Sequence, residues 1–220
     1  MMQEMEDLFS GAAELLNRIL FLPSAHSLVA VAGPPDAGKS LFAAQLVEVL
    51  NARLPGCAAA IPGDGFHYDN AVLTEWNLLD RKGAPETFDV GGLAALVRRL
   101  RTNDEAFVAV PVFDRELEIA RAGGRIVPQS VRYLIIEGNY LLLRTEPWSD
   151  LAQYFDLECI IREDPSLLER RLLGRWASHG LTPEAARGKV QNNDLPNAKL
   201  VLAESRATDL VICARQMVNS

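Results

Sequence analysis

The chain has 220 residues, which suits one full-sized domain better than two ordinary ones. Hydrophobic residues make up 49% and charged residues 23%, so a sizeable core can form and a disordered chain is excluded. The 22 basic and 29 acidic residues leave a formal charge of −7, which would repel the phosphate backbone of DNA or RNA. We therefore expect a single domain over residues 1–220 with no nucleic acid partner.

The three cysteines are odd in number and form no CxxC pair, which indicates a reducing compartment and no structural zinc. No apolar stretch approaches the roughly 18 residues of a membrane span. The first residues, MMQEMED, are acidic where a signal peptide would be positive. We expect a cytoplasmic protein without a membrane partner. The oligomeric state stays open, and a homodimer is one possibility.

Apolar residues near the N-terminus recur at helical spacing and predict one amphipathic helix over residues 3–22. Its polar face is mainly acidic, which favours packing on a core over lying on a membrane. Short apolar runs then alternate with helical patterns, which predicts a mostly parallel sheet. The expected strands are Ser27–Gly33, Cys57–Ile61, Phe107–Phe113, Tyr133–Gly138, Asp156–Arg162 and Asp209–Ala214. The expected helices are Ser40–Leu54, Val90–Arg101, Asp164–Trp176 and one that begins at Thr182.

The first expected strand runs directly into a segment that fits G-x-x-x-x-G-K-[ST] and precedes a helix. Glycines allow the backbone to form a nest of N–H groups around phosphate oxygens, and the helix N-terminus adds its positive dipole end. The lysine would reach the β- and γ-phosphates, and the hydroxyl would bind Mg²⁺. The sequence thus predicts a nucleotide-binding site formed by Gly33, Pro34, Pro35, Asp36, Ala37, Gly38, Lys39 and Ser40.

A phosphate-binding loop of this kind occurs in kinases, GTPases and ATPases alike. Asp89-Val90-Gly91-Gly92 spells the D-x-x-G switch of a GTPase, but it is expected to open a helix instead of following a strand. Asn197-Ala198-Lys199-Leu200 lacks the aspartate of a guanine-reading motif. A GTPase switch is therefore disfavoured.

The loop after the second expected strand carries acids, a histidine and aromatic residues, from Pro62 to Asn70. Parallel sheets bind ligands at the carboxyl ends of their strands, where this loop lies opposite the phosphate-binding loop. A carboxylate there can accept the proton of an attacking hydroxyl group. We expect Asp64 to be that general base. Neither His67 nor His179 has metal-ligand partners at useful spacing.

With these motifs in place, the chain resembles the P-loop small-molecule kinases of the phosphoribulokinase, uridine kinase and bacterial pantothenate kinase group. The resemblance runs from about Leu28 to the C-terminus, and the compact length looks most like bacterial kinases associated with sugar, notably fructose, transport. The segments that carry it are Asp64-Gly65-Phe66-His67-Tyr68 with Asn70, the run from Arg81 to Asp89, Ile135-Ile136-Glu137-Gly138, Asn193-Asp194-Leu195-Pro196-Asn197 and Ser205-Arg206-Ala207.

The resemblance implies a P-loop NTPase three-layer fold, in which helices cover both faces of the sheet and a small helical lid lies near residues 164–190. It implies that Glu137 assists Ser40 at the Mg²⁺ and that Arg206 contacts the nucleotide. Lid arginines would cover the transferring phosphate, because guanidinium groups match phosphate geometry. We expect Arg171 and Arg175 in that role, with Lys39 and Asp64 as the other catalytic residues. The expected acceptor-binding residues are Asp64, His67, Tyr68, Arg81, Lys82, Asp114, Arg115, Asn193 and Asn197.

The leading interpretation is a kinase that transfers the γ-phosphoryl group of ATP, with Mg²⁺, to a hydroxyl group of a small metabolite. A sugar such as fructose is the first choice. Pantothenate is less favoured, because Phe113-Asp114-Arg115 stands where pantothenate kinases carry a histidine. A uridine-type nucleoside also remains open as acceptor, since the acceptor pocket is built from loops. An alternative of another class is a non-catalytic nucleotide-binding regulatory protein.

Overall fold

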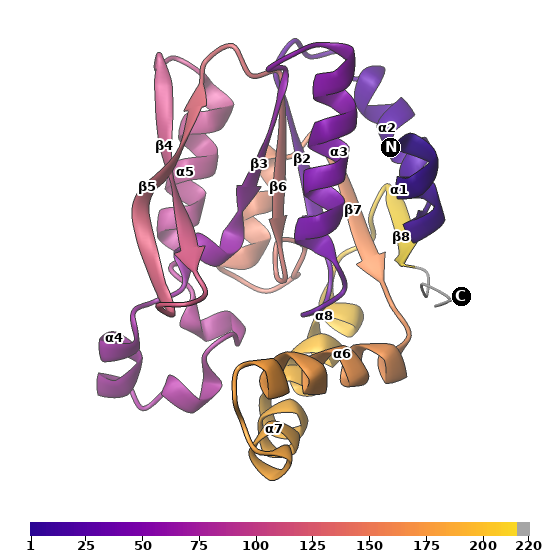
Figure 1. Cartoon of the computed structure of the whole chain (residues 1–220). Coiled ribbons are helices and arrows are strands. Elements are labelled where there is room, and N and C mark those ends of the chain that lie inside the picture. Colours follow the sequence, from indigo (N-terminus) through magenta and orange to yellow (C-terminus); the bar gives the residue numbers. More distant parts are fainter. Residues whose placement is uncertain (215–220) are drawn as a thin grey trace.

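Parallel strands form the centre of the molecule in the computed structural model, which describes residues 1–214 (Figure 1). Within these residues the main sheet has six strands in the order β1-β8-β7-β2-β6-β3. All neighbouring pairs are parallel except β1 with β8. The bounds are Phe9–Ser10 (β1), Ser27–Ala32 (β2), Ala58–Pro62 (β3), Tyr133–Gly138 (β6), Leu157–Arg162 (β7) and Leu210–Ala214 (β8).

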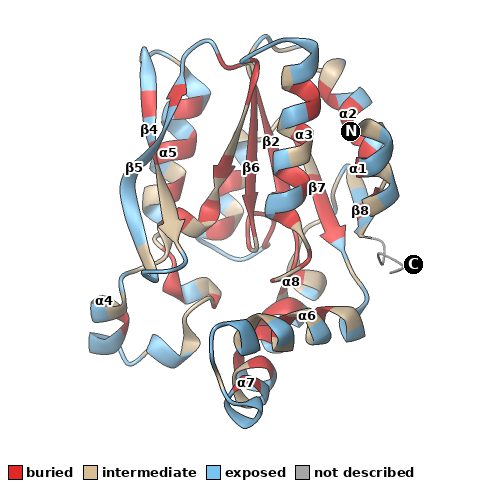
Figure 2. Ribbon diagram, viewed as in Figure 1, coloured by how far each residue is buried: buried red, intermediate tan, exposed pale blue. Residues whose placement is uncertain are grey.

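Helices cover both faces of this sheet, because alternate residues of its buried strands point to opposite sides. On β2, Val29 and Val31 pack with α1, α2 and α3, whereas Leu28 and Ala30 pack with α5 on the other face. Figure 2 shows the strands between the two helical layers as the most buried part of the chain. These helices are Met2–Leu8 (α1), Ala12–Leu20 (α2), Lys39–Arg53 (α3) and Val90–Thr102 (α5). The predicted three-layer α/β fold is confirmed.

The remaining helices lie mostly at the carboxyl end of the sheet, toward which the arrow of β7 points in Figure 1. They are Asn70–Glu75 (α4), Pro165–Ser178 (α6), Pro183–Lys189 (α7), a π-helical turn at Val190–Asp194 and Leu195–Glu204 (α8). Short 3₁₀ turns occur at Gly63–Phe66, Leu79–Arg81, Pro85–Thr87 and Trp148–Tyr154. No helix within residues 1–214 has the length and apolar character needed to cross a membrane.

The third predicted strand does not join the main sheet. Phe107–Asp114 (β4) instead pairs antiparallel with Ile119–Pro128 (β5), a strand that the sequence analysis did not predict. Most of β5 is solvent-exposed, so its sequence lacks the apolar run of a buried strand. The inner valines of the hairpin pack on the α5 side of the core, which holds the hairpin beside β3.

The prediction of one continuous helix over residues 3–22 was wrong, because the chain forms two short helices, α1 and α2, with the strand β1 between them. The chain leaves the helical path at Phe9–Ser10, which pairs with Cys213 and Ala214 of β8. Gly11 then has φ of 95°, a left-handed conformation that an L residue rarely adopts. The apolar positions of both short helices are buried as the helical spacing predicted. Pairing with a strand from the other end of the chain thus overrides local helical preference.

Candidate active site

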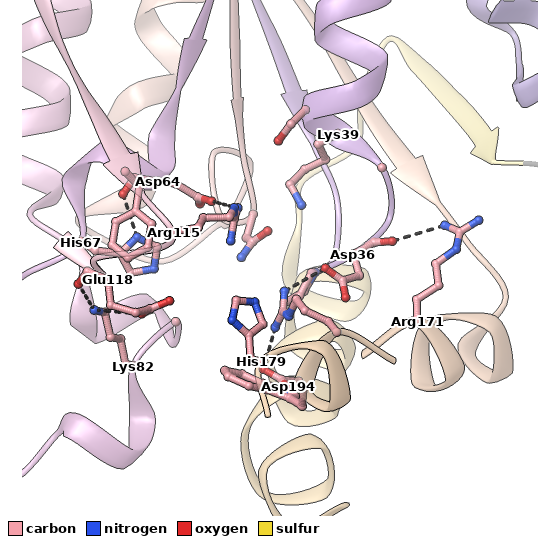
Figure 3. A pocket seen from close by; sticks show the side chains of 18 of the residues that line it. Asp36, Lys39, Asp64, His67, Lys82, Arg115, Glu118, Arg171, His179 and Asp194 are labelled. Atoms are coloured by element: carbon pink, nitrogen blue, oxygen red, sulfur yellow. Dashed lines mark hydrogen bonds and ion pairs between the residues drawn. The ribbon is translucent and has the colours of Figure 1, made fainter. Parts of the chain in front are cut away.

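A cavity of 340 Å³ lies at the carboxyl edge of the main sheet, where the phosphate-binding loop faces the Asp64 loop and α6 (Figure 3). The loop joins β2 to α3, and α3 begins at Lys39 immediately after Gly38. Its backbone N–H groups and the positive end of the α3 dipole therefore point toward this edge. Pro35, Asp36, Gly38, Lys39 and Ser40 line the cavity.

Lys39 is buried, with 8% of its surface exposed, and its ammonium group donates a hydrogen bond to the Pro34 carbonyl at 2.9 Å. Burial lowers the pKa of Lys39, while the Glu137, Asp64 and Asp36 carboxylates oppose that effect. A desolvated ammonium group beside a phosphate-binding nest matches the requirement for holding phosphate oxygens.

Glu137 lies at the end of β6, between the strand that leads to the phosphate-binding loop and the strand that leads to Asp64. It is 5% exposed, and the Ser40 hydroxyl donates to its Oε1 atom at 2.9 Å. Burial raises the pKa of Glu137, and the neighbouring Asp64 carboxylate raises it further. A buried carboxylate beside a hydroxyl at the phosphate edge suits Mg²⁺, which takes few protein ligands and keeps waters and phosphate oxygens as the others. The two residues predicted to hold the metal are thus brought together.

Asp64 lies in the 3₁₀ turn after β3, and its side chain is 24% exposed. The Arg115 guanidinium group donates to Asp64 Oδ2 at 2.7 Å (Figure 3). Arg115 comes from the turn between β4 and β5, so the hairpin reaches over the Asp64 loop. The ion pair orients the Asp64 carboxylate toward the cavity that Lys39 also lines.

Two more predicted acceptor residues line the cavity. His67 Nδ1 lies 2.8 Å from the Asp64 carbonyl oxygen, and its ring lies 4.0 Å from that of Phe88. Lys82 donates to Asn70 Oδ1 at 2.6 Å and to the Glu118 carbonyl at 2.9 Å. The bond from Lys82 to Glu118 ties the hairpin turn to the segment around Lys82. His67 contacts the turn that carries Asp64, so both side chains fix the shape of the acceptor side of the cavity.

The two arginines of α6 reach the phosphate-binding loop through Asp36. Arg175 donates to Asp36 Oδ1 at 2.8 Å, and Arg171 donates to the Asp36 carbonyl at 3.3 Å. Arg171 also lies 3.1 Å from Glu163. Both arginines therefore line the cavity beside the phosphate-binding loop.

Nine of the predicted site residues do not line the cavity. Three of them, Gly33, Pro34 and Ala37, belong to the phosphate-binding loop itself, and each of the other six has another partner. Tyr68 contacts the Trp76 ring, Arg81 pairs with Glu86, and Asp114 pairs with Arg121. Asn193 donates to the Lys82 carbonyl, and Asn197 donates to Asn193. Arg206, which follows α8, pairs with Glu158 of β7. The two asparagines support the wall around Lys82 from behind.

The cavity residues that the sequence analysis did not assign to the site include the polar residues Glu118, Asn139 and Asp194. Asn139 directly follows β6, a position that could have been read as part of the ligand edge. Asp194 accepts a hydrogen bond from the Trp176 ring nitrogen at 2.6 Å and lies 3.6 Å from Arg175. Glu118 carries no such signal, because only the unpredicted hairpin brings it to the cavity.

Comparison with known proteins agrees with this geometry. No protein-family model matches the chain. A "putative uridine kinase C227.14" of Schizosaccharomyces pombe is 30% identical over 214 residues, which cover 94% of this chain and 89% of that protein. The structure of a "putative fructose transport system kinase" from Silicibacter sp. TM1040 is 40% identical, covers 91% of this chain and 98% of its own, and superposes with a TM-score of 0.84.

The chain belongs to the P-loop kinases of the uridine kinase, pantothenate kinase and phosphoribulokinase group. A pantothenate kinase of Limosilactobacillus reuteri is 30% identical over 151 residues, but the match covers only 49% of that enzyme. Phosphoribulokinase from Rhodobacter spheroides, at 14% identity and a TM-score of 0.56, shares the fold alone. This P-loop kinase is therefore an ATP-dependent phosphotransferase, as its resemblance to the group predicted.

Proposed function

We propose that this P-loop kinase transfers the γ-phosphoryl group of Mg-ATP to a hydroxyl group of a small metabolite, with a sugar such as fructose as the first choice. The observation that carries the proposal is the position of Asp64, which faces the phosphate-binding loop across one cavity with Lys39, Ser40 and Glu137. The relative from Silicibacter, whose name refers to fructose transport, supports a sugar over other acceptors.

The proposed reaction forms a bond between the acceptor hydroxyl oxygen and the γ-phosphorus while the bond from that phosphorus to the bridging oxygen of ADP breaks. The electron pair of the broken bond stays on ADP, and the hydroxyl proton passes to Asp64. Mg²⁺, when bound, neutralises developing charge on the phosphate oxygens. Ser40 and Glu137 would hold the metal, while Lys39 orients the β- and γ-phosphates.

Arg115 has to release or share the Asp64 carboxylate as the acceptor binds, because its guanidinium group occupies Oδ2. The other oxygen of Asp64 stays available to the hydroxyl group. Arg171 and Arg175 would exchange their contacts with Asp36 for contacts with the transferring phosphate. The segment of residues 164–190 would in this way act as a lid.

The lid role predicts slower hydrogen exchange across Leu168–Gly180 when ATP analogue and acceptor are bound. A lid has to open for nucleotide exchange and to close over the reacting phosphate, since an open site admits water. Exchange measured by mass spectrometry on free and liganded protein checks this expectation. The helix α5, none of whose residues lines the cavity, serves as an internal control that should not change. Equal protection of Leu168–Gly180 in both states would count against a lid.

A screen of sugars, polyols, nucleosides and pantothenate for acceptor-dependent ADP release tests the proposed function. We expect a sugar to raise ADP release above the basal ATPase rate. A preference for uridine or pantothenate would support the assignment as a kinase but would change the proposed class of acceptor. Nucleotide binding without any acceptor-dependent turnover would favour a non-catalytic regulatory protein instead.

A further inference from the structure

A second cavity, of 250 Å³, runs along the free edge of β3 and opens into the active site at Asp64 and Glu137. The helix α3 forms one wall, β3 forms the floor, and the β4–β5 hairpin forms the other wall. We call this cavity the edge slot. Small side chains keep it open, namely Ala43 and Ala44 of α3 and Ala60 of β3. Its remaining lining residues are Ser40, Pro62, Val112, Phe113, Arg115 and Arg125.

Arg125 of β5 occupies an inward position of the hairpin that otherwise holds valines. In the strand register it lies opposite Val110, and the neighbouring inward pair is Val108 with Val127. Those three valines are buried in the core, whereas Arg125 stays solvent-accessible. Its Nη1 atom donates to the carbonyl of Ala60 on the edge strand β3. The Arg125 side chain is exposed, so its charge keeps contact with water at this inward position.

A bend in β5 directs Arg125 over the edge slot. The register shifts between Val110 and Val112, so the single residue Pro111 lies opposite three residues of β5. Gly123 has φ of 64°, and a Cβ atom on Gly124 would lie 2.2 Å from Val112 Cγ2. The left-handed φ at Gly123 favours glycine, and a side chain at Gly124 would clash with Val112. Bulges beside active sites commonly re-aim a side chain. The bulge in β5 thus lies immediately before Arg125 in the sequence, where it sets the direction of the Arg125 side chain.

The charge of Arg125 is unbalanced, in contrast to the other hairpin arginines. Arg115 pairs with Asp64, and Arg121 pairs with Asp114. Within residues 1–214, no carboxylate lies within ion-pair distance of Arg125, and its one hydrogen-bond acceptor is the Ala60 carbonyl. A guanidinium group has five donors in a planar fork that fits carboxylate and phosphate oxygens. Arg125 therefore presents free donors to the edge slot.

We propose that the edge slot binds the acceptor through an anionic group at Arg125, so that the acceptor is an acidic sugar derivative, either a sugar acid or a sugar phosphate. The proposal rests on the proposed function, because it assumes that the reacting hydroxyl group lies at Asp64. Ala60 lies two residues before Pro62, which is about 7 Å along a strand. A short sugar chain spans such a distance, with its hydroxyl group at Asp64 and its anion at Arg125.

A purely structural role is the competing explanation for Arg125. Inward charges blunt exposed sheet edges, and Arg125 satisfies a carbonyl on the free edge of β3. That role predicts a loss of stability on substitution and no change in the choice of acceptor. The anion-binding role predicts a change in KM for charged acceptors alone. Measurements of both quantities on the same variants separate the two explanations.

The test compares fructose, gluconate and fructose 6-phosphate as acceptors for the wild type, Arg125→Gln and Arg125→Lys. Arg99→Gln is the matched control, because Arg99 is an exposed arginine that pairs with Glu105 and lines neither cavity. We expect an anionic acceptor to have the highest kcat/KM in the wild type. Arg125→Gln should raise its KM about tenfold to a hundredfold with little change in kcat, since charge-assisted hydrogen bonds are lost. Arg125→Lys should restore part of the affinity.

Several outcomes would overturn the inference. Preference for neutral fructose, or an equal effect of Arg125→Gln on neutral and charged acceptors, would leave the proposed function standing and refute the anion site. A lower melting temperature of Arg125→Gln with unchanged acceptor preference would show that Arg125 has a structural role at the edge of β3. Absence of ADP release with every acceptor would refute the proposed function and the inference together. The carboxylate and phosphate arms identify which anion is bound.

Discussion

Replacing Asp64 by asparagine should lower kcat by about 10²- to 10⁴-fold, the usual contribution of a positioned general base, and leave Mg-ATP affinity nearly unchanged. Asparagine keeps the shape of the side chain but cannot take the hydroxyl proton. The Arg115 guanidinium group, 2.7 Å from Asp64 Oδ2, loses a charged partner in this variant, so a modest rise in acceptor KM should accompany the fall in kcat. The measurements are steady-state kinetics with the identified acceptor and a Mg-ATP titration.

Asp69→Asn is the matched control for this variant. Asp69 begins α4 and accepts a hydrogen bond from the Ala71 N–H group, and asparagine fills that role equally well. The control should therefore keep normal turnover. Near-normal turnover of Asp64→Asn would eliminate Asp64 as the base. Matched losses of Mg-ATP binding and turnover would instead move Asp64 to the metal site beside Glu137.

Replacing Lys39 by alanine or methionine should weaken Mg-ATP binding or slow turnover by about 10²- to 10³-fold, the scale seen when one preorganised donor to developing charge is removed. The side chain is 8% exposed and belongs to no apolar cluster, so its main contribution is the charge at the cavity. Methionine keeps the length of the stem, which separates loss of charge from loss of volume. Calorimetry with Mg-ATP and kinetics with the acceptor measure the two effects.

A folded protein is required for that comparison, so melting temperatures accompany both variants. Lys199→Ala is the control, because Lys199 is an exposed lysine of α8 outside the cavity. It should bind Mg-ATP normally. If a folded Lys39→Met protein showed undiminished Mg-ATP binding and turnover, the assignment of the phosphate-binding loop to the nucleotide site would be refuted.

The sequence by itself determined the elements whose signals are local. The positions of the phosphate-binding loop and Asp64 could be predicted because each follows an apolar strand, and the carboxyl ends of parallel strands share one edge. Glu137 lies at the end of such a strand, and its expected role came from the family resemblance. The start of α5 could be predicted for the same local reason: the Asp89 carboxylate accepts the Gly92 N–H group at 2.8 Å, which makes Asp89-Val90-Gly91-Gly92 a helix cap. The helical spacing of Leu15 and Ile19 likewise identified residues that are buried.

Only the tertiary structure decided which distant residues complete the site. Arg115 reaches Asp64 across 51 residues, and it does so because β4 pairs with β5, a strand that the apolar pattern did not reveal. The edge slot and the position of Arg125 depend on the same hairpin. The break at Phe9–Ser10 depends on pairing with β8 at the far end of the chain. Helix caps and phosphate-binding loops are formed by residues that are neighbours in the sequence. Strand pairing is stabilised by contacts between residues far apart in the sequence, and a local sequence pattern does not identify the partner strand.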